Sequence, residues 1–478
     1  MFPKGFVWGA ATSAYQIEGG ARADGRGASV WDQFCTAEGA IKGGEAGDTA
    51  CDHYRRYESD VGLMKSMGLK AYRFSISWPR VMPEGTGAVN PEGMSFYDRL
   101  VDRLLEAGIE PWATLFHWDL PLELHRRGGW LNPDSPRWFE EYAGRMVDLL
   151  SDRVTHWMTI NEPQIFVGLG YGTGVHAPGQ KLVFAEQLLI GHRSLLAHGR
   201  AVRVIRARAK RLAQVGWAPV GRVGIPITDS RADVEAARRR SMEIDAKAFW
   251  NNTWFGDAVC LGRYPEDGLR LFGADAPRVA SGDMETIRQP LDYYGVNIYS
   301  GEPVRAGDNG EPVGVPRGAG YPQTAFGWTV EPESLYWGPR FLYERYGLPI
   351  VITENGLSCF DLVGTDGKVH DPARIDFLTR YLRSLRRAVR DGAKVTGYFQ
   401  WSLLDNFEWA EGYRQRFGLI FVDFATQERI PKDSAAWYSE VIRTNGGVLG
   451  PIDDRPESGT EALRVTVVSG TKPTTRPA

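Results

Sequence analysis

Eight short apolar or β-branched segments recur along the chain, and segments with helical periodicity separate most of them. The eight segments are residues 6–16, 71–78, 109–118, 156–163, 222–230, 292–300, 349–356 and 395–405. Alternation of strands with helices predicts a parallel sheet with right-handed crossover connections. Because there are eight strands, the sheet is expected to close. The sequence therefore predicts an α/β fold, a single (β/α)8 TIM barrel with long βα loops.

The clearest helical segment is 95–108, where apolar residues stand at positions i, i+3, i+4, i+7 and i+8. Residues 136–153 and 374–392 repeat this pattern. Gly108 and Gly392 end two of the three segments, as expected of glycines that follow a helix C-terminus.

The length of 478 residues and a hydrophobic content of 43% allow one large core without help from disulfides or metals. No internal repeat or mid-chain linker divides the chain, so residues 1–445 are expected to form one catalytic domain. From residue 446 the periodicity is lost, and 446–478 are predicted to be a disordered tail. Residues 301–323 are rich in Gly and Pro and are predicted to be a loop.

Charge and cysteine content exclude several classes of function. The chain has 56 Lys and Arg against 59 Asp and Glu, a balance that favours no nucleic-acid partner. Its four cysteines are widely spaced, which favours free thiols in the cytoplasm. The N-terminus lacks a signal-peptide pattern, and no apolar run is long enough for a membrane span. The sequence gives no indication of the oligomeric state.

Polar residues follow almost every predicted strand, at the end where TIM barrels build their active sites. They are Gln16, Glu18, Arg73, His117, Trp118, Asp119, Asn161, Glu162, Asn297, Tyr299, Glu354, Asn355, Trp401, Asp405 and Asn406. The fifth segment offers only Thr228 and Asp229. A catalytic site is therefore expected at the carboxyl ends of the strands.

The residue types at these strand ends narrow the chemistry. No metal-ligand spacing, phosphate-binding loop or serine-hydrolase elbow is present, so neither a metal nor a cofactor is expected. Glu162 and Glu354 end strands that are three steps apart, which would place them across the barrel mouth. Two opposed carboxylates beside Trp, Asn and Gln suit cleavage of a glycosidic bond. Taken singly, Glu162 could be a helix N-terminal charge and Glu354 a solvated turn residue.

Several motifs together resemble glycoside hydrolase family 1, the β-glucosidase family, from Phe2 to Asn445. They are WGAATSAYQIEG, CDHYRRYESDVGLMKSMGLKAYRFSISWPR, TLFHWDLP, TINEP, HAPG, GVNIY, ITENG and WSLLDNFEWAEGY. The resemblance implies a retaining enzyme in which Glu162 is the acid/base and Glu354 the nucleophile. Arg73 and Tyr299 would lie beside Glu354, with Arg73 lowering the pKa of that carboxylate. Retention implies carboxyl groups about 5–5.5 Å apart.

The resemblance also implies a site for the non-reducing sugar. Its residues would be Gln16, His117, Trp118, Asn161, Asn297, Trp401, Glu408, Trp409 and Phe417. Trp328 would flank the leaving group, or else pack under the loop before it. The carboxylate of Glu408 would repel a phosphate, so an unphosphorylated sugar is expected.

The implied activity is hydrolysis of terminal β-D-glucosyl residues, with galactosyl and fucosyl residues as further candidates. The substrate would be a small β-glycoside or a β-linked oligosaccharide. The alternatives are a transglycosylating β-glycosidase using the same intermediate and a non-catalytic sugar-binding pseudoenzyme.

Overall fold

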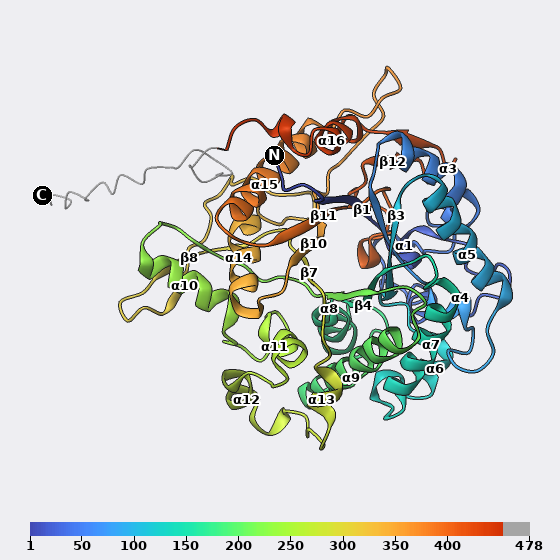
Figure 1. Ribbon diagram of the computed structural model, residues 1–478, viewed down its shortest axis with the longest axis horizontal. Coiled ribbons are helices and arrows are strands. Elements are labelled where there is room, and N and C mark those ends of the chain that lie inside the picture. Colours follow the sequence, from blue (N-terminus) through green and yellow to red (C-terminus); the bar gives the residue numbers. More distant parts are fainter. Residues whose placement is uncertain (453–478) are drawn as a thin grey trace, which may run out of the picture.

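The computed structural model describes residues 1–452, in which eight parallel strands form the central barrel (Figure 1). The barrel strands are β1 (Val7–Ala11), β2 (Ala71–Ser75), β3 (Glu110–Phe116), β4 (His156–Asn161), β5 (Gln214–Ala218), β7 (Tyr294–Asn297), β10 (Ile350–Asn355) and β11 (Val395–Trp401). Their order in the sheet is β5-β4-β3-β2-β1-β11-β10-β7. The predicted fold class is confirmed.

The two outer strands of this order, β5 and β7, close the barrel through main-chain hydrogen bonds. Asp292 N donates to Val215 O at 2.9 Å, and Asn297 N donates to Pro219 O at 2.9 Å. Gly221 N in turn donates to Asn297 O at 2.8 Å. Closure leaves the barrel without long unpaired strand edges.

The prediction for the fifth strand is wrong, because the barrel strand is Gln214–Ala218 and not residues 222–230. A glycine at position 216 weakens the strand pattern of this short segment. The structure explains that glycine, since a Cβ atom there would lie 2.3 Å from the Tyr293 ring inside the barrel. The predicted segment instead supplies β6 (Gly224–Pro226) of a separate small sheet.

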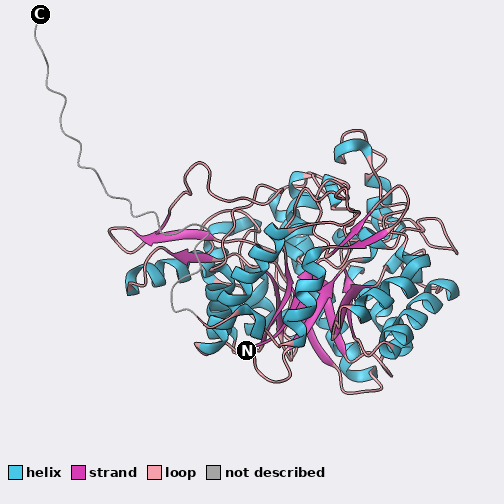
Figure 2. Ribbon diagram, turned by 90° about the horizontal axis from the view of Figure 1, so that it is seen from above, coloured by secondary structure: helices cyan, strands magenta, loops and turns pink. Residues whose placement is uncertain are grey.

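The loop predicted at 301–323 also contains strands. β8 (Glu302–Ala306) and β9 (Pro312–Gly314) form an antiparallel hairpin, and β8 pairs with β6 in parallel. This sheet lies beside α10 (Arg231–Met242), outside the barrel (Figures 1 and 2). β12 (Ile420–Val422) and β13 (Arg429–Pro431) form a second hairpin.

Helices surround the barrel strands (Figure 2). The longer ones are α3 (His53–Ser66), α5 (Pro91–Glu106), α7 (Ser135–Leu150), α9 (Phe184–Arg208), α11 (Thr253–Leu261), α14 (Ser334–Tyr346), α15 (Pro372–Arg390) and α16 (Asp433–Arg443). The shorter ones are α1 (Ala14–Ile17), α2 (Val30–Phe34), α4 (Trp78–Val81), α6 (Leu122–Arg126), α8 (Pro163–Val167), α12 (Glu266–Phe272) and α13 (Asp283–Ile287). The three predicted helices correspond to α5, α7 and α15. Gly108 and Gly392 follow two of them with φ of +75° and +103°.

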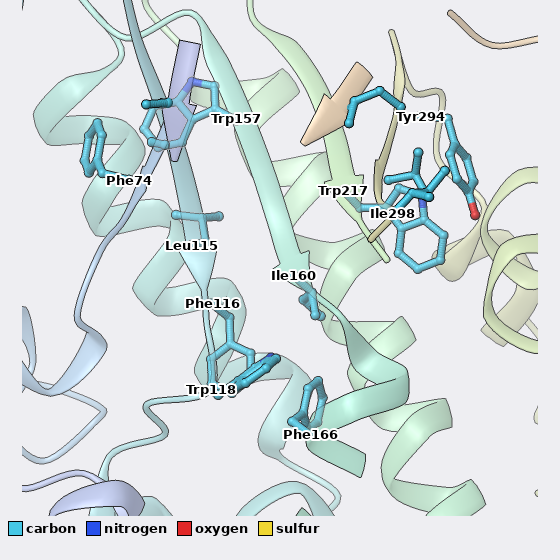
Figure 3. Packing of buried hydrophobic residues seen from close by; sticks show 14 of the residues in the cluster. Phe74, Leu115, Phe116, Trp118, Trp157, Ile160, Phe166, Trp217, Tyr294 and Ile298 are labelled. Carbon is cyan, nitrogen blue, oxygen red and sulfur yellow. The ribbon is translucent and has the colours of Figure 1, made fainter. Parts of the chain in front are cut away.

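The hydrophobic core has two parts. The larger part lies between strands and helices, where Phe116 packs edge-to-face on Phe166 and Trp217 on Tyr294 (Figure 3). The smaller part fills the barrel interior and includes Trp112, Phe399, Trp401 and Phe417. The barrel is therefore a packed body rather than a pore, and its carboxyl end opens into a cavity.

Two of the register irregularities at this end of the barrel concern strands that lead to the cavity. β4 slips against β5 between Met158 and Asn161, and β10 slips against β7 between Ile352 and Glu354. Such irregularities re-aim side chains. After the second slip, Glu354 pairs with Asn297 on the neighbouring strand.

Residues 446–452, which the sequence placed in the tail, include a 3₁₀ turn at Gly447–Leu449. Arg383 Nε of α15 donates to Leu449 O at 2.8 Å. The remainder of the predicted tail lies outside the described residues. All four cysteines are free. Within residues 1–452, no helix is both long and apolar enough to cross a membrane.

Candidate active site

A cavity of about 1040 Å³ opens at the carboxyl ends of the barrel strands. Ten of the predicted site residues line it, namely His117, Trp118, Glu162, Tyr299, Trp328, Glu354, Trp401, Glu408, Trp409 and Phe417. They come from five different barrel strands, or from the segments that directly follow those strands. The barrel therefore brings together residues up to 300 positions apart.

The other four predicted residues lie directly behind the cavity surface, and each contacts a lining residue. Arg73 donates to Glu354, Asn297 to Glu162, and Gln16 to Glu408. Asn161 Nδ2 lies 3.1 Å from His117 Nε2. All four are fully buried, so they fix the position of the lining side chains.

Both carboxylate oxygens of Glu354 are held. Arg73 Nη1 donates to Oε1 at 2.5 Å, and the Tyr299 hydroxyl donates to Oε2 at 2.7 Å. The same Arg73 donates to Thr353 O at 3.0 Å and, through Nη2, to Asn161 Oδ1 at 2.6 Å. Glu354 is thus placed rigidly, with its carboxylate facing the cavity.

Glu162 directly follows β4 and precedes Pro163, the first residue of α8. Its backbone is left-handed, with φ +42°, a conformation that costs free energy for a residue with a side chain. Asn297 Nδ2 donates to its Oε1 at 2.8 Å. In residues 1–452, no Lys or Arg lies within ion-pair distance of Glu162, whereas Glu354 has Arg73.

Burial raises the pKa of both carboxyl groups, but different neighbouring groups counteract this effect at Glu162 and at Glu354. Burial and the Glu354 carboxylate raise the pKa of Glu162 to about 8. Burial also raises the pKa of Glu354, against the opposing effects of Arg73, Tyr299 and Asn297. The predicted net lowering of the Glu354 pKa is therefore wrong, because it omitted the desolvation of a buried carboxylate. Since the donors of Glu354 stabilise an anion, the pair loses its first proton from Glu354.

Glu408 lies at the inner end of the cavity, where Gln16 Nε2 donates to its Oε2 at 3.2 Å. Burial, aided by the Glu354 carboxylate, raises the pKa of Glu408 to about 8. The ring of Trp409 lies 4.6 Å from that of Trp118, measured between centroids. Trp118 and Trp409 are both left-handed, with φ of +80° and +50°. This end offers aromatic faces and hydrogen-bonding groups, which together suit a sugar ring.

Trp328 also lines the cavity, stacked on Phe326 with ring centroids 4.4 Å apart. The sequence reasoning missed Phe326, although it stands only two positions before Trp328. It also missed four other cavity-lining residues, none of which stands at the end of a predicted strand: Phe34, Val220, Arg222 and Trp250. His176 lines the cavity too, and its HAPG motif was noted without a role.

Other polar strand-end residues do not line this cavity. Glu18 accepts a hydrogen bond from Arg80 at 2.7 Å, and Asp405 pairs with Lys432 at 2.7 Å. Asn355 donates to Ile298 O at 2.8 Å. Within the described part of the chain, no group of three His, Cys, Asp or Glu side chains is placed to hold a metal ion.

Comparison with known proteins agrees with this geometry. The sequence profile of glycosyl hydrolase family 1 matches residues 1–447. The 1,4-beta-D-glucan glucohydrolase of Thermotoga neapolitana is 44% identical over 454 residues, covering 93% of this chain and 99% of the relative. Beta-glucosidase A of Thermotoga maritima is 43% identical over 455 residues, covering 93% and 98%.

Solved structures are similar over the same length. The beta-glucosidase from Thermotoga maritima in complex with glucoimidazole has a TM-score of 0.85 and 43% sequence identity, covering 93% of this chain and 99% of that one. The same enzyme in complex with deoxynojirimycin gives the same values.

Proposed function

The chain belongs to glycosyl hydrolase family 1, and we propose that it is a retaining β-glucosidase acting on terminal non-reducing β-D-glucosyl residues. The substrate is a small β-glycoside or a β-linked oligosaccharide. The catalytic domain comprises residues 1–445. The roles are assigned from one observation: Arg73 and Tyr299 donate hydrogen bonds to Glu354, whereas no cation lies beside Glu162 among the described residues.

Glu354 is the nucleophile. Arg73 and Tyr299 donate to its two oxygens, which stabilises the anion and fixes the carboxylate for attack on the anomeric carbon. Glu162 is the acid, because its pKa of about 8 keeps it protonated at neutral pH. In the first step the glycosidic oxygen takes the Glu162 proton and leaves as an alcohol. Glu354 becomes esterified to the sugar.

The second step uses the same two groups. Once Glu354 is an ester it carries no negative charge, so the repulsion that raised the pKa of Glu162 is lost. Glu162, now ionised, takes a proton from water, whose oxygen attacks the anomeric carbon. The sugar is released with its original β configuration, and both carboxyl groups regain their starting protonation states.

The sugar-binding residues act around this pair. Gln16, His117 and Glu408 offer hydrogen bonds to hydroxyl groups, while Trp401, Trp409 and Phe417 offer ring faces. Burial lowers the pKa of His117 well below its usual value, so the ring is neutral and serves in hydrogen bonding. Asn297 positions Glu162 through its hydrogen bond, and Asn161 positions Arg73 and His117 from behind the cavity surface.

Release of p-nitrophenol from p-nitrophenyl β-D-glucoside tests the activity, with the β-galactoside and β-fucoside alongside. Absence of turnover on every β-glycoside contradicts the proposal.

Two azide experiments then test the roles of Glu354 and Glu162. Glu354→Gly with azide should yield the α-glucosyl azide by one displacement. Glu162→Ala with azide should yield the β-glucosyl azide, because azide attacks the intermediate without a base. If Glu354→Gly yields the β-glucosyl azide and Glu162→Ala the α-glucosyl azide, the two roles must be reversed.

We also propose that the enzyme acts in the cytoplasm. Four free cysteines support this location, because oxidising compartments favour disulfides. Fractionation of the source cells, with activity followed in each fraction, tests it.

A further inference from the structure

The part of the cavity next to Glu162, called the outer half below, has an apolar wall where the leaving group would depart. Ile165 of α8, Val220 and Trp250 line it. The Gln164 amide joins these segments by donating to Val220 O at 3.2 Å and Asn251 O at 3.3 Å. Trp250 is 48% exposed, which is unusual for so large an apolar side chain. Its indole is thus available to a ligand in the cavity.

A second apolar wall is formed by the stacked rings of Phe326 and Trp328. Trp328 also contacts Tyr299, with ring centroids 5.3 Å apart. Because Tyr299 donates to Glu354, this wall continues from the nucleophile outward. A leaving group attached to the anomeric carbon therefore passes aromatic faces as it extends from the reaction centre.

Polar side chains in this half of the cavity are already engaged with protein partners. Arg222 pairs with Asp245 at 3.1 Å and with Glu302 at 3.2 Å. Ser300 Oγ donates to Thr329 O at 2.6 Å. Glu38 is exposed at the rim, where water solvates it.

His176 also lines the cavity, and it presents a neutral imidazole ring rather than a charged group. Burial lowers the pKa of His176 to about 4, so the imidazole is neutral at neutral pH. Its centroid lies 5.7 Å from that of Trp118. A second sugar in this region would bring several hydroxyl groups, and a hydroxyl buried without a partner costs free energy. An apolar group carries no such cost and gains from the removal of its surface from water.

We propose that this half of the cavity selects apolar alkyl or aryl leaving groups over a second glucosyl unit, with Trp250 as a specificity-determining residue. The proposal rests on the β-glucosidase activity proposed above. It concerns the same site and names the class of aglycone that the site takes.

The first test measures kcat/KM for methyl, butyl, hexyl and octyl β-D-glucoside and for cellobiose. These substrates all release alcohols, so differences report contacts to the leaving group more than differences in acidity. Each methylene that becomes buried can raise kcat/KM by up to about fourfold. We expect an octyl-to-methyl ratio of about 30 or more, and a lower kcat/KM for cellobiose than for octyl glucoside.

Trp250→Ala should lower the octyl-to-methyl ratio about fivefold or more, since one apolar wall is lost. The matched control is Phe360→Ala, which removes an aromatic ring that is 78% exposed and does not line the cavity. This control should keep the wild-type ratio. Thermal melting of both variants checks that they fold.

Three results would overturn the proposal. They are a wild-type ratio near one, a preference for cellobiose over octyl glucoside, and an unchanged ratio in Trp250→Ala. Each of them leaves the β-glucosidase activity standing. If methyl and p-nitrophenyl β-glucoside are both inert, the activity itself is wrong and the aglycone proposal falls with it.

Discussion

The Tyr299 hydroxyl donates a hydrogen bond to Oε2 of Glu354 over 2.7 Å, while Oε1 of the same carboxylate accepts from Arg73. Tyr299 follows β7 and Glu354 lies near the end of β10, which are neighbouring strands in the barrel. Barrel geometry therefore places the donor and the acceptor together without a flexible loop between them. The orientation of the nucleophile is set by two rigid strands.

Tyr299→Phe removes this hydrogen bond and keeps the ring. Hydrogen bonds to charged groups contribute about 1.5–3 kcal/mol, so we expect kcat to fall about 10- to 100-fold. The acidic limb of the pH profile should move to higher pH, because the Glu354 anion loses a donor. A pH series of kcat/KM on p-nitrophenyl β-glucoside measures both effects. An unchanged acidic limb would mean that Tyr299 does not act through Glu354.

Glu162→Gln should remove the alkaline limb of the pH profile. The wild-type acid has a pKa raised to about 8, so kcat/KM for cellobiose should fall above that pH. The variant cannot donate a proton, and we expect a loss of about 10²- to 10⁴-fold with no such limb. Glu408→Gln is the control, because the pKa of Glu408 is also raised to about 8. If the alkaline limb disappears in Glu408→Gln but not in Glu162→Gln, the limb reports Glu408, and the prediction for Glu162 is wrong.

Glu408 should also make stability depend on pH. Its pKa in the folded protein is about 8, above the ordinary value near 4.3, so the native state binds more protons between these values. The free energy of unfolding therefore falls as pH rises through that window. Glu408→Gln should raise Tm relative to wild type, and by more at pH 9 than at pH 5. Differential scanning fluorimetry at both values measures the difference.

The control for that experiment is Glu440→Gln. Glu440 is exposed on α16, and a hydrogen bond from Arg443 lowers the pKa of its carboxyl. The difference in Tm between Glu440→Gln and the wild type should not be larger at pH 9 than at pH 5. A Glu408 effect that is equal at both pH values would contradict the raised pKa.

Gly216→Ala should destabilise the barrel. The new Cβ atom would lie 2.3 Å from the Tyr293 ring, and overpacking of this kind costs about 1–3 kcal/mol. Gly62→Ala is the matched control, because Gly62 lies on α3 with no atom within 4 Å of its Cβ position. That control should be stabilised by about 0.5–1 kcal/mol. Urea unfolding of both variants measures the two changes, and equal midpoints would rule out the clash.

Much of the barrel could be predicted because most of its strands carry β-branched or aromatic runs between helical segments. β10, for example, begins with Ile350, Val351 and Ile352 and ends at the polar residues Glu354 and Asn355. β5 could not be predicted, because Gly216 is needed to make room for the ring of Tyr293, which directly precedes β7, and periodicity contains no such information. The hairpin at β8 and β9 was hidden by the Gly and Pro that flank it.

The site residues that could be predicted are those that stand at or directly after the ends of barrel strands. Glu162, Glu354 and His117 are examples. Trp250 and Phe326 belong to long connecting segments, whose path depends on tertiary packing. The direction of the Glu354 pKa also escaped prediction, because desolvation depends on how completely neighbouring segments cover the carboxylate.

The left-handed backbone of Glu162 has a consequence for how this family member can evolve. Glycine would relieve the strained φ and remove a carboxylate that ionises at a cost in a buried place. Relief of this strain opposes the loss of the hydrogen bond from Asn297, and activity requires the carboxyl group. A population of random variants sorted on thermal resistance alone should drift toward inactive proteins at this position.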